Sequence, residues 1–212
     1  MNTGQLIDAL SADVPPVARA PLGRIMCAVM ALAAVVAVCV MLATVGPRHH
    51  LEQAPAGLLL LKLLFPTTMA AIGGFVLFNA MRPGQDVGRW SPYLWMPMVF
   101  VGVAGMFALV IQPVSQWDDM VLGTNWAMCL LCIPLFAILP FALLIVALRR
   151  GAPTELARTG AMAGLVAGAL GAAAYSLHCP DDSVPFVAVW YAGLILLCAA
   201  AGRWLGPRLL RW

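Results

Sequence analysis

Two short stretches of the sequence contain side chains that could bind a metal or undergo redox chemistry. The stretch NWAMCLLCIP contains Cys129 and Cys132, and the stretch LHCPDDS contains His178 and Cys179. Thiolates, with an imidazole beside them, are ligands that copper and other thiophilic metals prefer. In an oxidising compartment, the same thiols could instead form a disulfide and act as a redox switch. A C-x-x-C pair without a second pair is only moderately specific, and membrane cysteines are also common apolar filler.

The composition indicates that these residues belong to a membrane protein. Hydrophobic residues make up 63% of the 212-residue chain and charged residues only 10%, and the mean hydropathy is +0.93. A transmembrane helix needs about 20 mainly apolar residues. Six runs meet this need, at 24–45, 57–80, 93–112, 125–148, 157–177 and 185–204. Short connections favour antiparallel neighbours, so we expect an all-α membrane protein with a six-transmembrane-helix bundle.

This arrangement divides the chain into a tail, residues 1–23, and a transmembrane domain, residues 24–212. The six runs and their short connections leave no room for a soluble catalytic domain, so we do not expect an enzyme. The fifth run carries glycines four residues apart, at positions 160, 164 and 168. Such a stripe of small residues predicts close packing against another helix.

The distribution of basic side chains predicts the orientation of the bundle. Cytoplasmic connections of membrane proteins are enriched in arginine and lysine. Ten of the twelve basic residues fall on the side of the two termini: Arg19, Arg24, Arg82, Arg89, Arg149, Arg150, Arg158, Arg203, Arg208 and Arg211. We therefore expect a multi-pass protein of the bacterial inner (cytoplasmic) membrane, with both termini in the cytoplasm and the opposite end in the periplasm.

In this orientation, the candidate metal or redox residues converge at the periplasmic end. Cys129 and Cys132 lie within the first two turns of the fourth run, on one helical face. His178 and Cys179 lie in the connection that follows the fifth run, which is expected to be a neighbour of the fourth. The sequence therefore predicts a sensing site with no constitutive cofactor, where copper or another thiophilic metal could act as the signal.

Three charged residues could support this site. Lys62 lies about one turn below the same surface, where its charge could favour thiolates, although its ammonium could also snorkel to the interface. Asp181 and Asp182 lie next to Cys179 in the sequence. Asp182 or Ser183 could alternatively cap the last helix, with a proline in its first turn.

The tail contains a candidate partner-binding segment, TGQLIDALSADVPPV. A short helix that stops at the prolines would place Leu6, Ile7 and Leu10 on one face, with Asp8 and Asp13 as polar residues. Such a helix is marginal alone in water, and it can fold when its apolar face docks into a partner's groove. A membrane-surface anchor usually carries basic residues. The acidic polar residues therefore favour binding to a basic cytoplasmic protein.

Several of these stretches resemble the NrsF family of bacterial membrane anti-sigma factors. They are LIDALSADVPPV, LLKLLFPTT, CLLCIPLFAILPFALLIVALRRGAPT, YSLHCPDDSVPFVAVWY and LGPRLLRW, and the HCPDDS segment is the most specific. The resemblance implies that the protein holds an extracytoplasmic-function sigma factor at the membrane and releases it upon a heavy-metal or related stress. It further implies that the tail binds the sigma factor, and that Cys179 with one or both of Cys129 and Cys132 senses the signal.

Two other functions are compatible with parts of the sequence. A membrane thiol-disulfide oxidoreductase could use Cys129 and Cys132, but a relay to substrate usually needs a second redox pair. A transporter would carry ionisable residues deep within its spans, and Lys62 is the one such residue in the six runs. The basic residues follow the membrane topology and form no patch, so we expect no direct contact with nucleic acid. The expected partners are the sigma factor and the lipid bilayer.

Overall fold

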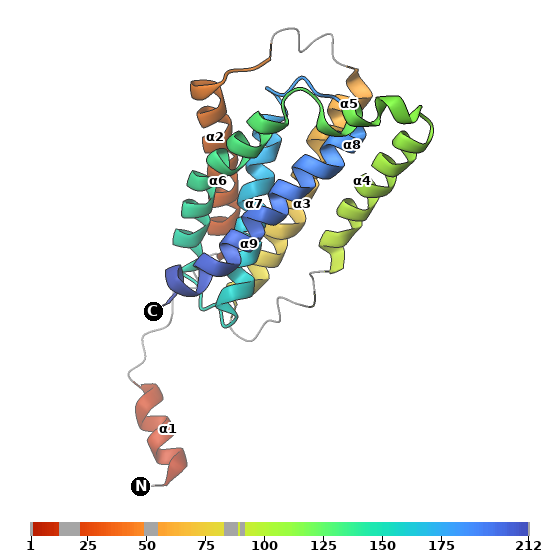
Figure 1. Cartoon of the computed structure of the whole chain (residues 1–212). Helices are drawn as coiled ribbons and strands as arrows, with labels where there is room; N and C mark the ends of the chain where they lie inside the picture. Colours follow the sequence, from red (N-terminus) through yellow and green to blue (C-terminus); the bar gives the residue numbers. More distant parts are fainter. Residues whose placement is uncertain (1, 13–21, 49–54, 83–88, 90–91, 212) are drawn as a thin grey trace.

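The chain folds into a bundle of α-helices in a computed structural model, which describes residues 2–12, 22–48, 55–82, 89 and 92–211. The helices of these residues are α1 (Thr3–Ala12), α2 (Leu22–Thr44), α3 (Ala56–Ala80), α4 (Pro92–Val110), the 3₁₀ turn η3 (Val114–Gln116), α5 (Trp117–Leu122), α6 (Trp126–Leu148), α7 (Leu156–Tyr175), α8 (Val184–Phe186), the π-helical segment η4 (Val187–Tyr191) and α9 (Ala192–Leu209). Six helical stretches in this part of the chain are long and apolar enough to cross a membrane (Figure 1). The predicted all-helical architecture with six potential spans is confirmed.

The bundle has two chemically different ends. The loop between α7 and α8 lies with α5 at one end, which we call the loop end (Figure 1). The start of α2 and the C-terminus lie together at the opposite end, which we call the termini end. The described members of the predicted basic set lie at or near the termini end, whereas Arg19 lies outside the described residues. Which end faces the cytoplasm stays a prediction.

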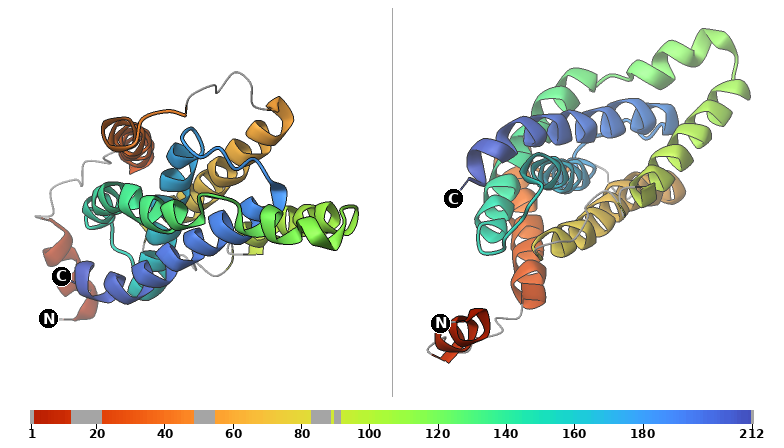
Figure 2. Two further views of the ribbon diagram at one scale, coloured as in Figure 1. Left: turned by 45° about the horizontal axis from the view of Figure 1, so that its top comes forward. Right: turned by 90° about the horizontal axis from the view of Figure 1, so that it is seen from below.

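Helix α7 forms the centre of the bundle, with α2, α3, α6 and α9 packed around it (Figure 2). Its glycine stripe lies against α9, as predicted. A Cβ atom on Gly164 would meet the backbone of Cys198 and, at 3.1 Å, the Cα atom of Gly202. Gly160 likewise faces Gly202 and Gly206, so both helices contribute glycines to the contact. The two backbones therefore approach more closely than any larger side chain would allow.

The connection before the fourth span and the end of the sixth span differ from the prediction. The connection before α6 contains the short helix α5, which the sequence analysis treated as a loop. The indole of Trp190 donates a hydrogen bond to the Val121 carbonyl (2.9 Å), and the Ser183 hydroxyl donates one to the Met120 carbonyl (2.6 Å), so two of the open carbonyls of α5 are satisfied. Gly123 then turns the chain with a φ of 59°, which glycine adopts without strain. The last span continues to Leu209, beyond the predicted end at residue 204.

The predicted tail helix is present as α1, and Asp13 lies outside the described residues. Its first turn is held by a reciprocal pair: the Asn2 side chain accepts from the Gln5 N–H (2.9 Å), and the Gln5 side chain accepts from the Asn2 N–H (3.2 Å). The apolar face is exposed, at 43% for Leu6, 59% for Ile7 and 67% for Leu10. Within the described residues, α1 therefore has an apolar face that is not covered by the bundle.

The glycine contact between α7 and α9 generates a stability prediction. Replacing Gly164 with leucine would drive a side chain into the Cys198 backbone, and overpacking of this kind typically costs about 1–3 kcal/mol. We expect Gly164→Leu to lower the thermal unfolding midpoint of the detergent-solubilised protein by roughly 2–12 °C. Gly193→Leu in α9 is the matched control, because no heavy atom lies within 4 Å of the Cβ position there. Equal losses in the two variants would contradict this packing.

Candidate functional site

Two of the predicted site cysteines, fifty residues apart in the sequence, meet at the loop end. Cys129 lies in the first turn of α6, and its side chain is fully buried. Cys179 follows the last turn of α7, where its N–H and that of His178 both donate to the Tyr175 carbonyl, at 3.0 and 2.9 Å. Pro180 ends this turn. The thiols of Cys129 and Cys179 then face each other closely enough to hydrogen-bond, and we call them the thiol pair.

Two buried tyrosines flank the thiol pair. The Tyr175 hydroxyl lies beside Cys129, and the Tyr191 hydroxyl lies beside Cys179. Both side chains are fully buried, and neither hydroxyl has a nitrogen or oxygen hydrogen-bond partner. The two rings also pack against each other, with centroids 6.3 Å apart. Buried hydroxyls normally have such partners, so these two hydroxyls are available to a ligand bound at the thiol pair.

Lys62 of α3 holds the loop that carries Cys179. Its Nζ donates to the Cys179 carbonyl (2.7 Å), the Asp181 carbonyl (2.9 Å) and the Asp182 carboxylate (3.1 Å). The lysine side chain is fully buried, so it does not snorkel to the interface, and that alternative is wrong. The reason is that three acceptors inside the bundle replace the water that an interface would supply. Losing one partner of a buried ion pair typically costs about 3–5 kcal/mol.

Arg48, just beyond α2, binds the same loop from the other side. Its guanidinium donates to the Asp182 carboxylate (2.7 Å) and to the Cys179 carbonyl (3.3 Å). Its backbone N–H donates to the Leu177 carbonyl (3.1 Å). Asp182 thus bridges two cations with its two carboxylate oxygens, and it is mostly buried itself, with 11% of its side chain exposed. The loop is therefore fastened to both α2 and α3.

Asp181 has a different role from its neighbour. One of its carboxylate oxygens accepts from the N–H and the hydroxyl of Thr124, at 3.2 and 3.0 Å, and the other accepts from the Asn125 N–H (2.8 Å). It therefore binds the chain directly before α6, where a negative charge is also favoured by the helix dipole. The Asn125 side chain makes no capping bond. Ser183 caps α8 by accepting from the Phe186 N–H, as one of the predicted alternatives stated.

The surroundings of Cys179, which lies outside the membrane-spanning segments, change its acidity. The hydrogen bond from the Cys129 thiol lowers the pKa of Cys179 to about 7, and the positive charge of Lys62 acts in the same direction, against the effect of burial. The Asp181 N–H also stabilises the thiolate. Thiolates are the reactive and metal-binding form of cysteine. Cys179 is therefore the member of the pair that ionises first.

Cys132 and His178, the other two predicted ligands, are not part of the thiol pair. Cys132 is buried one turn deeper along α6. The Nδ1 atom of His178 lies 2.9 Å from the Gly46 carbonyl, which can only accept, and its ring packs against Tyr175. This contact ties the end of α7 to the end of α2 and leaves Nε2 for other partners.

The residues present fit a soft metal ion held by few ligands. The thiol pair offers two sulfur donors, and the hydroxyls beside it lack nitrogen or oxygen partners. Soft thiolates select ions such as copper(I). In the part of the chain that the structure describes, no group of three or more histidine, cysteine or acidic side chains is arranged to hold a metal. Any such ion would therefore be bound mainly by Cys129 and Cys179.

Sequence reasoning missed three residues of this site. Arg48 had a signal, because it is the one arginine on the sparsely charged side of the bundle. Tyr175 lies one helical turn before Cys179, which places it on the same face. Tyr191 resembled an interfacial aromatic residue near a helix end, yet it is fully buried. It belongs to the π-helical segment η4, whose extra residue per turn changes which side chains face the bundle.

The acidity of Cys179 generates a titration prediction. With a pKa of about 7, the thiol is protonated below this pH and ionised above it, so thiolate ultraviolet absorbance should rise through neutral pH. We expect Cys179→Ser to abolish this transition. Cys129→Ala, which removes the hydrogen bond, and Lys62→Met, which removes the charge, should both move it to higher pH. Cys132→Ala is the matched control and should leave the midpoint in place. A parent protein without a thiolate transition below pH 8 would contradict the assignment.

Comparison with known proteins identifies the family of this chain. The family described as "Negative regulator of sigma F", NrsF, matches residues 10–212. The probable anti-sigma-F factor NrsF of Azospira oryzae and the anti-sigma-F factor NrsF of Caulobacter vibrioides are each 32% identical to this chain over the whole length of both proteins. No solved structure matches the chain. The match covers nearly every residue, including all four of the predicted metal or redox residues, and so the chain belongs to the NrsF family of negative regulators of sigma F.

Proposed function

We propose that this protein is a membrane-bound anti-sigma factor of the bacterial inner membrane. It sequesters an extracytoplasmic-function sigma factor on the cytoplasmic side and releases it when the thiol pair meets a copper-like metal or an oxidant in the periplasm. The anti-sigma role is supported by two full-length relatives that are named anti-sigma-F factors. The sensing role is carried by one observation, the contact between Cys129 and Cys179 at the end of the bundle opposite the termini.

The tail is the candidate sigma-binding element. Helix α1 exposes Leu6, Ile7 and Leu10, and Asp8 adds an acidic group to the same short helix. A partner with an apolar groove and a basic rim would cover this face and compensate the charge. Ten residues supply less than the roughly 800 Å² that a partner typically buries. The arginine-bearing connections at the termini end are therefore expected to contribute, together with Asp13.

The thiol pair is placed to change the packing of several helices at once. Cys129 belongs to α6, while Cys179 belongs to a loop that Lys62 binds to α3 and Arg48 binds to α2. Shortening or lengthening the distance between the two sulfur atoms therefore pulls on three helices. For a signal to cross the bundle, two packings must differ in affinity for both the signal and the sigma factor. The π-helical segment η4, which contains Tyr191, is the described element best suited to shift between two registers.

Two chemical events could act on the pair. In metal binding, Cys179 and then Cys129 lose their protons and supply sulfur donors to a thiophilic ion. In oxidation, the two thiols form one disulfide bond, and an external two-electron oxidant accepts both electrons while two protons pass to water. Both events replace a hydrogen bond between thiols by a fixed link. Oxidation also removes the thiolate that Lys62 and the Asp181 N–H stabilise, whereas metal binding keeps it as a ligand.

The output half of the proposal is tested by capture of the cognate sigma factor on the detergent-solubilised protein. We expect the triple variant Leu6→Ser, Ile7→Ser, Leu10→Ser to bind at least roughly a hundredfold more weakly, because each apolar side chain contributes about 1.5–3 kcal/mol when buried. Ser11→Ala is the control on the same helix, and it should bind as the parent does. Capture of the sigma factor by the triple variant at the parent's strength would remove the tail from the interface.

The input half is tested by adding copper to the same complex. We expect copper to release the sigma factor from the parent and from Cys198→Ser, but not from the double variant Cys129→Ser, Cys179→Ser. Release from Cys132→Ser would show that the thiol pair suffices. Equal release from the parent and the double variant would refute sensing through the pair. If the protein captured no sigma factor and instead exchanged disulfides with a periplasmic protein, the thiol-disulfide oxidoreductase would replace the anti-sigma factor.

A further inference from the structure

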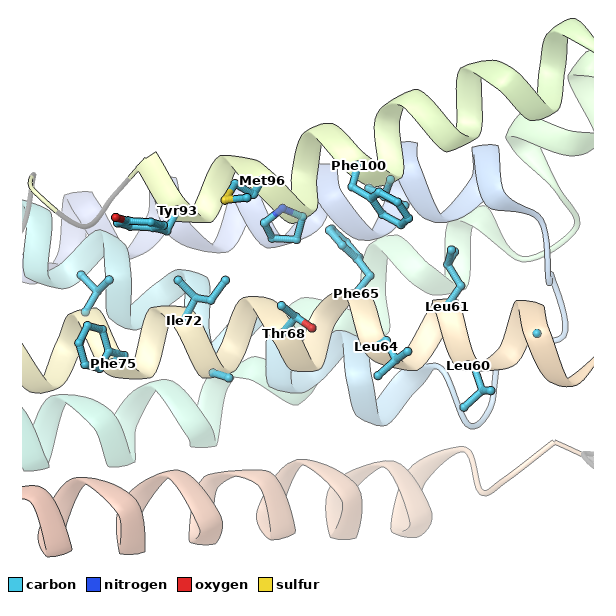
Figure 3. Close-up of a pocket in the computed structure, with 15 residues that line it drawn as sticks. Leu60, Leu61, Leu64, Phe65, Thr68, Ile72, Phe75, Tyr93, Met96 and Phe100 are labelled. Carbon is cyan, nitrogen blue, oxygen red and sulfur yellow. The ribbon is translucent and has the colours of Figure 1, made fainter.

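Helices α3 and α4 leave a large apolar groove between them, on the opposite side of α3 from the thiol pair's helix α6. Its volume is about 1020 Å³, at the upper end of the range of about 300–1,000 Å³ that is common for small-molecule pockets. Figure 3 shows Leu61, Phe65 and Ile72 of α3 pointing toward α4, which contributes Met96 and Phe100 to this space. Two of the fifteen lining residues, Thr68 and Tyr93, carry a hydroxyl, and none is charged.

The groove exists because α4 packs against the bundle mainly through its second half. Its second half packs on the start of the last span: a Cβ atom at Gly105 would lie 3.1 Å from the Ala188 side chain and 3.4 Å from the backbone of Pro185. Its first half stands apart from α3 and α9 at the termini end (Figure 1). Residues Met96 and Phe100 are each 67% exposed, although they line the groove. Nothing in the described part of the chain fills the space between the two helices.

In a bilayer, this space must be filled by something apolar. Both helices are apolar enough to span the hydrocarbon layer, where water is excluded. Protein interiors contain few voids larger than a water molecule. The groove is open along its length to the surrounding lipid, so an acyl chain can enter it sideways. An acyl chain matches the lining, because it needs no hydrogen-bond partner.

The α3 side of the groove runs along most of that helix, from Gly57 to Val76, whereas its α4 side lies in one half of α4. The α4 residues that line it run from Tyr93 to Val101, which is the first half of the helix. This half lies at the termini end. A lipid with its chain between α3 and this half of α4 therefore has its head group at the termini end, near the Tyr93 ring.

The charge at that end favours an anionic head group. The connection between α3 and α4 carries Arg82 and Arg89 against a single carboxylate, Asp86. The Arg82 guanidinium lies 4.6 Å from the centre of the Phe78 ring, two residues beyond the groove lining on α3, and this ring also lies next to Gly23 of α2. Guanidinium groups bind phosphate with paired hydrogen bonds. Basic pockets between transmembrane helices are established sites for anionic phospholipids.

We propose that an anionic phospholipid of the leaflet at the termini end occupies this groove, with an acyl chain between α3 and α4 and its phosphate beside Arg82 and Arg89. The lipid would act as a wedge that supports the first half of α4. This site is separate from the thiol pair, and its existence does not depend on the sensing function.

The proposal is tested by native mass spectrometry of the full-length protein in detergent, titrated with phosphatidylglycerol or with phosphatidylcholine of the same chains. We expect the parent to bind phosphatidylglycerol roughly tenfold or more tightly than phosphatidylcholine, since each arginine near a membrane surface adds to the attraction. Arg82→Gln with Arg89→Gln should abolish this preference. Arg211→Gln, at the same end but near the C-terminus, should keep it.

A second pair of variants tests the groove itself. Ala71 lines the groove, and Ala71→Phe should fill it and weaken binding of both lipids at least roughly tenfold. Ala31→Phe places the same ring on the exposed face of α2 and should leave lipid binding unchanged. Equal affinity of the parent for the two lipids would overturn the charged site. Unchanged lipid binding by Ala71→Phe, or a protein dimer that only Ala71→Phe dissociates, would overturn the lipid occupant.

Discussion

A buried ammonium group organises the loop end of this bundle. An unpaired lysine in the apolar part of a helical bundle would be very costly, so Lys62 needs acceptors that the helices themselves cannot offer. The loop after α7 supplies them as two carbonyls and one carboxylate. Once these bonds form, the loop has little conformational freedom. Cys179 then lies against Cys129, and Asp181 lies at the start of α6. The thiol pair is thus a consequence of how one charge is neutralised.

The same constraint separates the roles of two adjacent carboxylates. Asp182 neutralises Lys62 and Arg48, whereas Asp181 points to the start of α6 and binds the chain before it. The two residues are consecutive in the chain, so a displacement of one also moves the other. Hydrogen bonds of 2.7 to 3.3 Å thus connect the segment around Cys179 to α2, α3 and α6. No long chain of intermediate contacts is needed for these helices to respond together.

Much of the fold could be predicted from the sequence, because it follows from local patterns. Apolar runs of sufficient length gave all six potential spans, and the spacing of Gly160, Gly164 and Gly168 indicated a close helix contact. The convergence of the sequence-distant cysteines was also predictable from the antiparallel order of the helices. The choice of Cys129 rather than Cys132 as the neighbour of Cys179 was not, because it depends on Lys62 and on the loop conformation. The burial of Tyr191 escaped prediction for a similar reason, since a π-helical segment does not follow the 3.6-residue period.

The glycine contact between α7 and α9 has a consequence for how sequences of this family can diverge. Gly160 faces Gly202 and Gly206 across the contact, and Gly164 faces Gly202 and the backbone of Cys198. A smaller side chain on the opposite helix would make no room for a larger residue, because the atoms that a Cβ atom would meet belong to the opposite backbone. A substitution on one helix is therefore not rescued by a compensating change on the other. These positions are expected to stay invariant among functional relatives, while the lipid-facing residues beside them exchange freely.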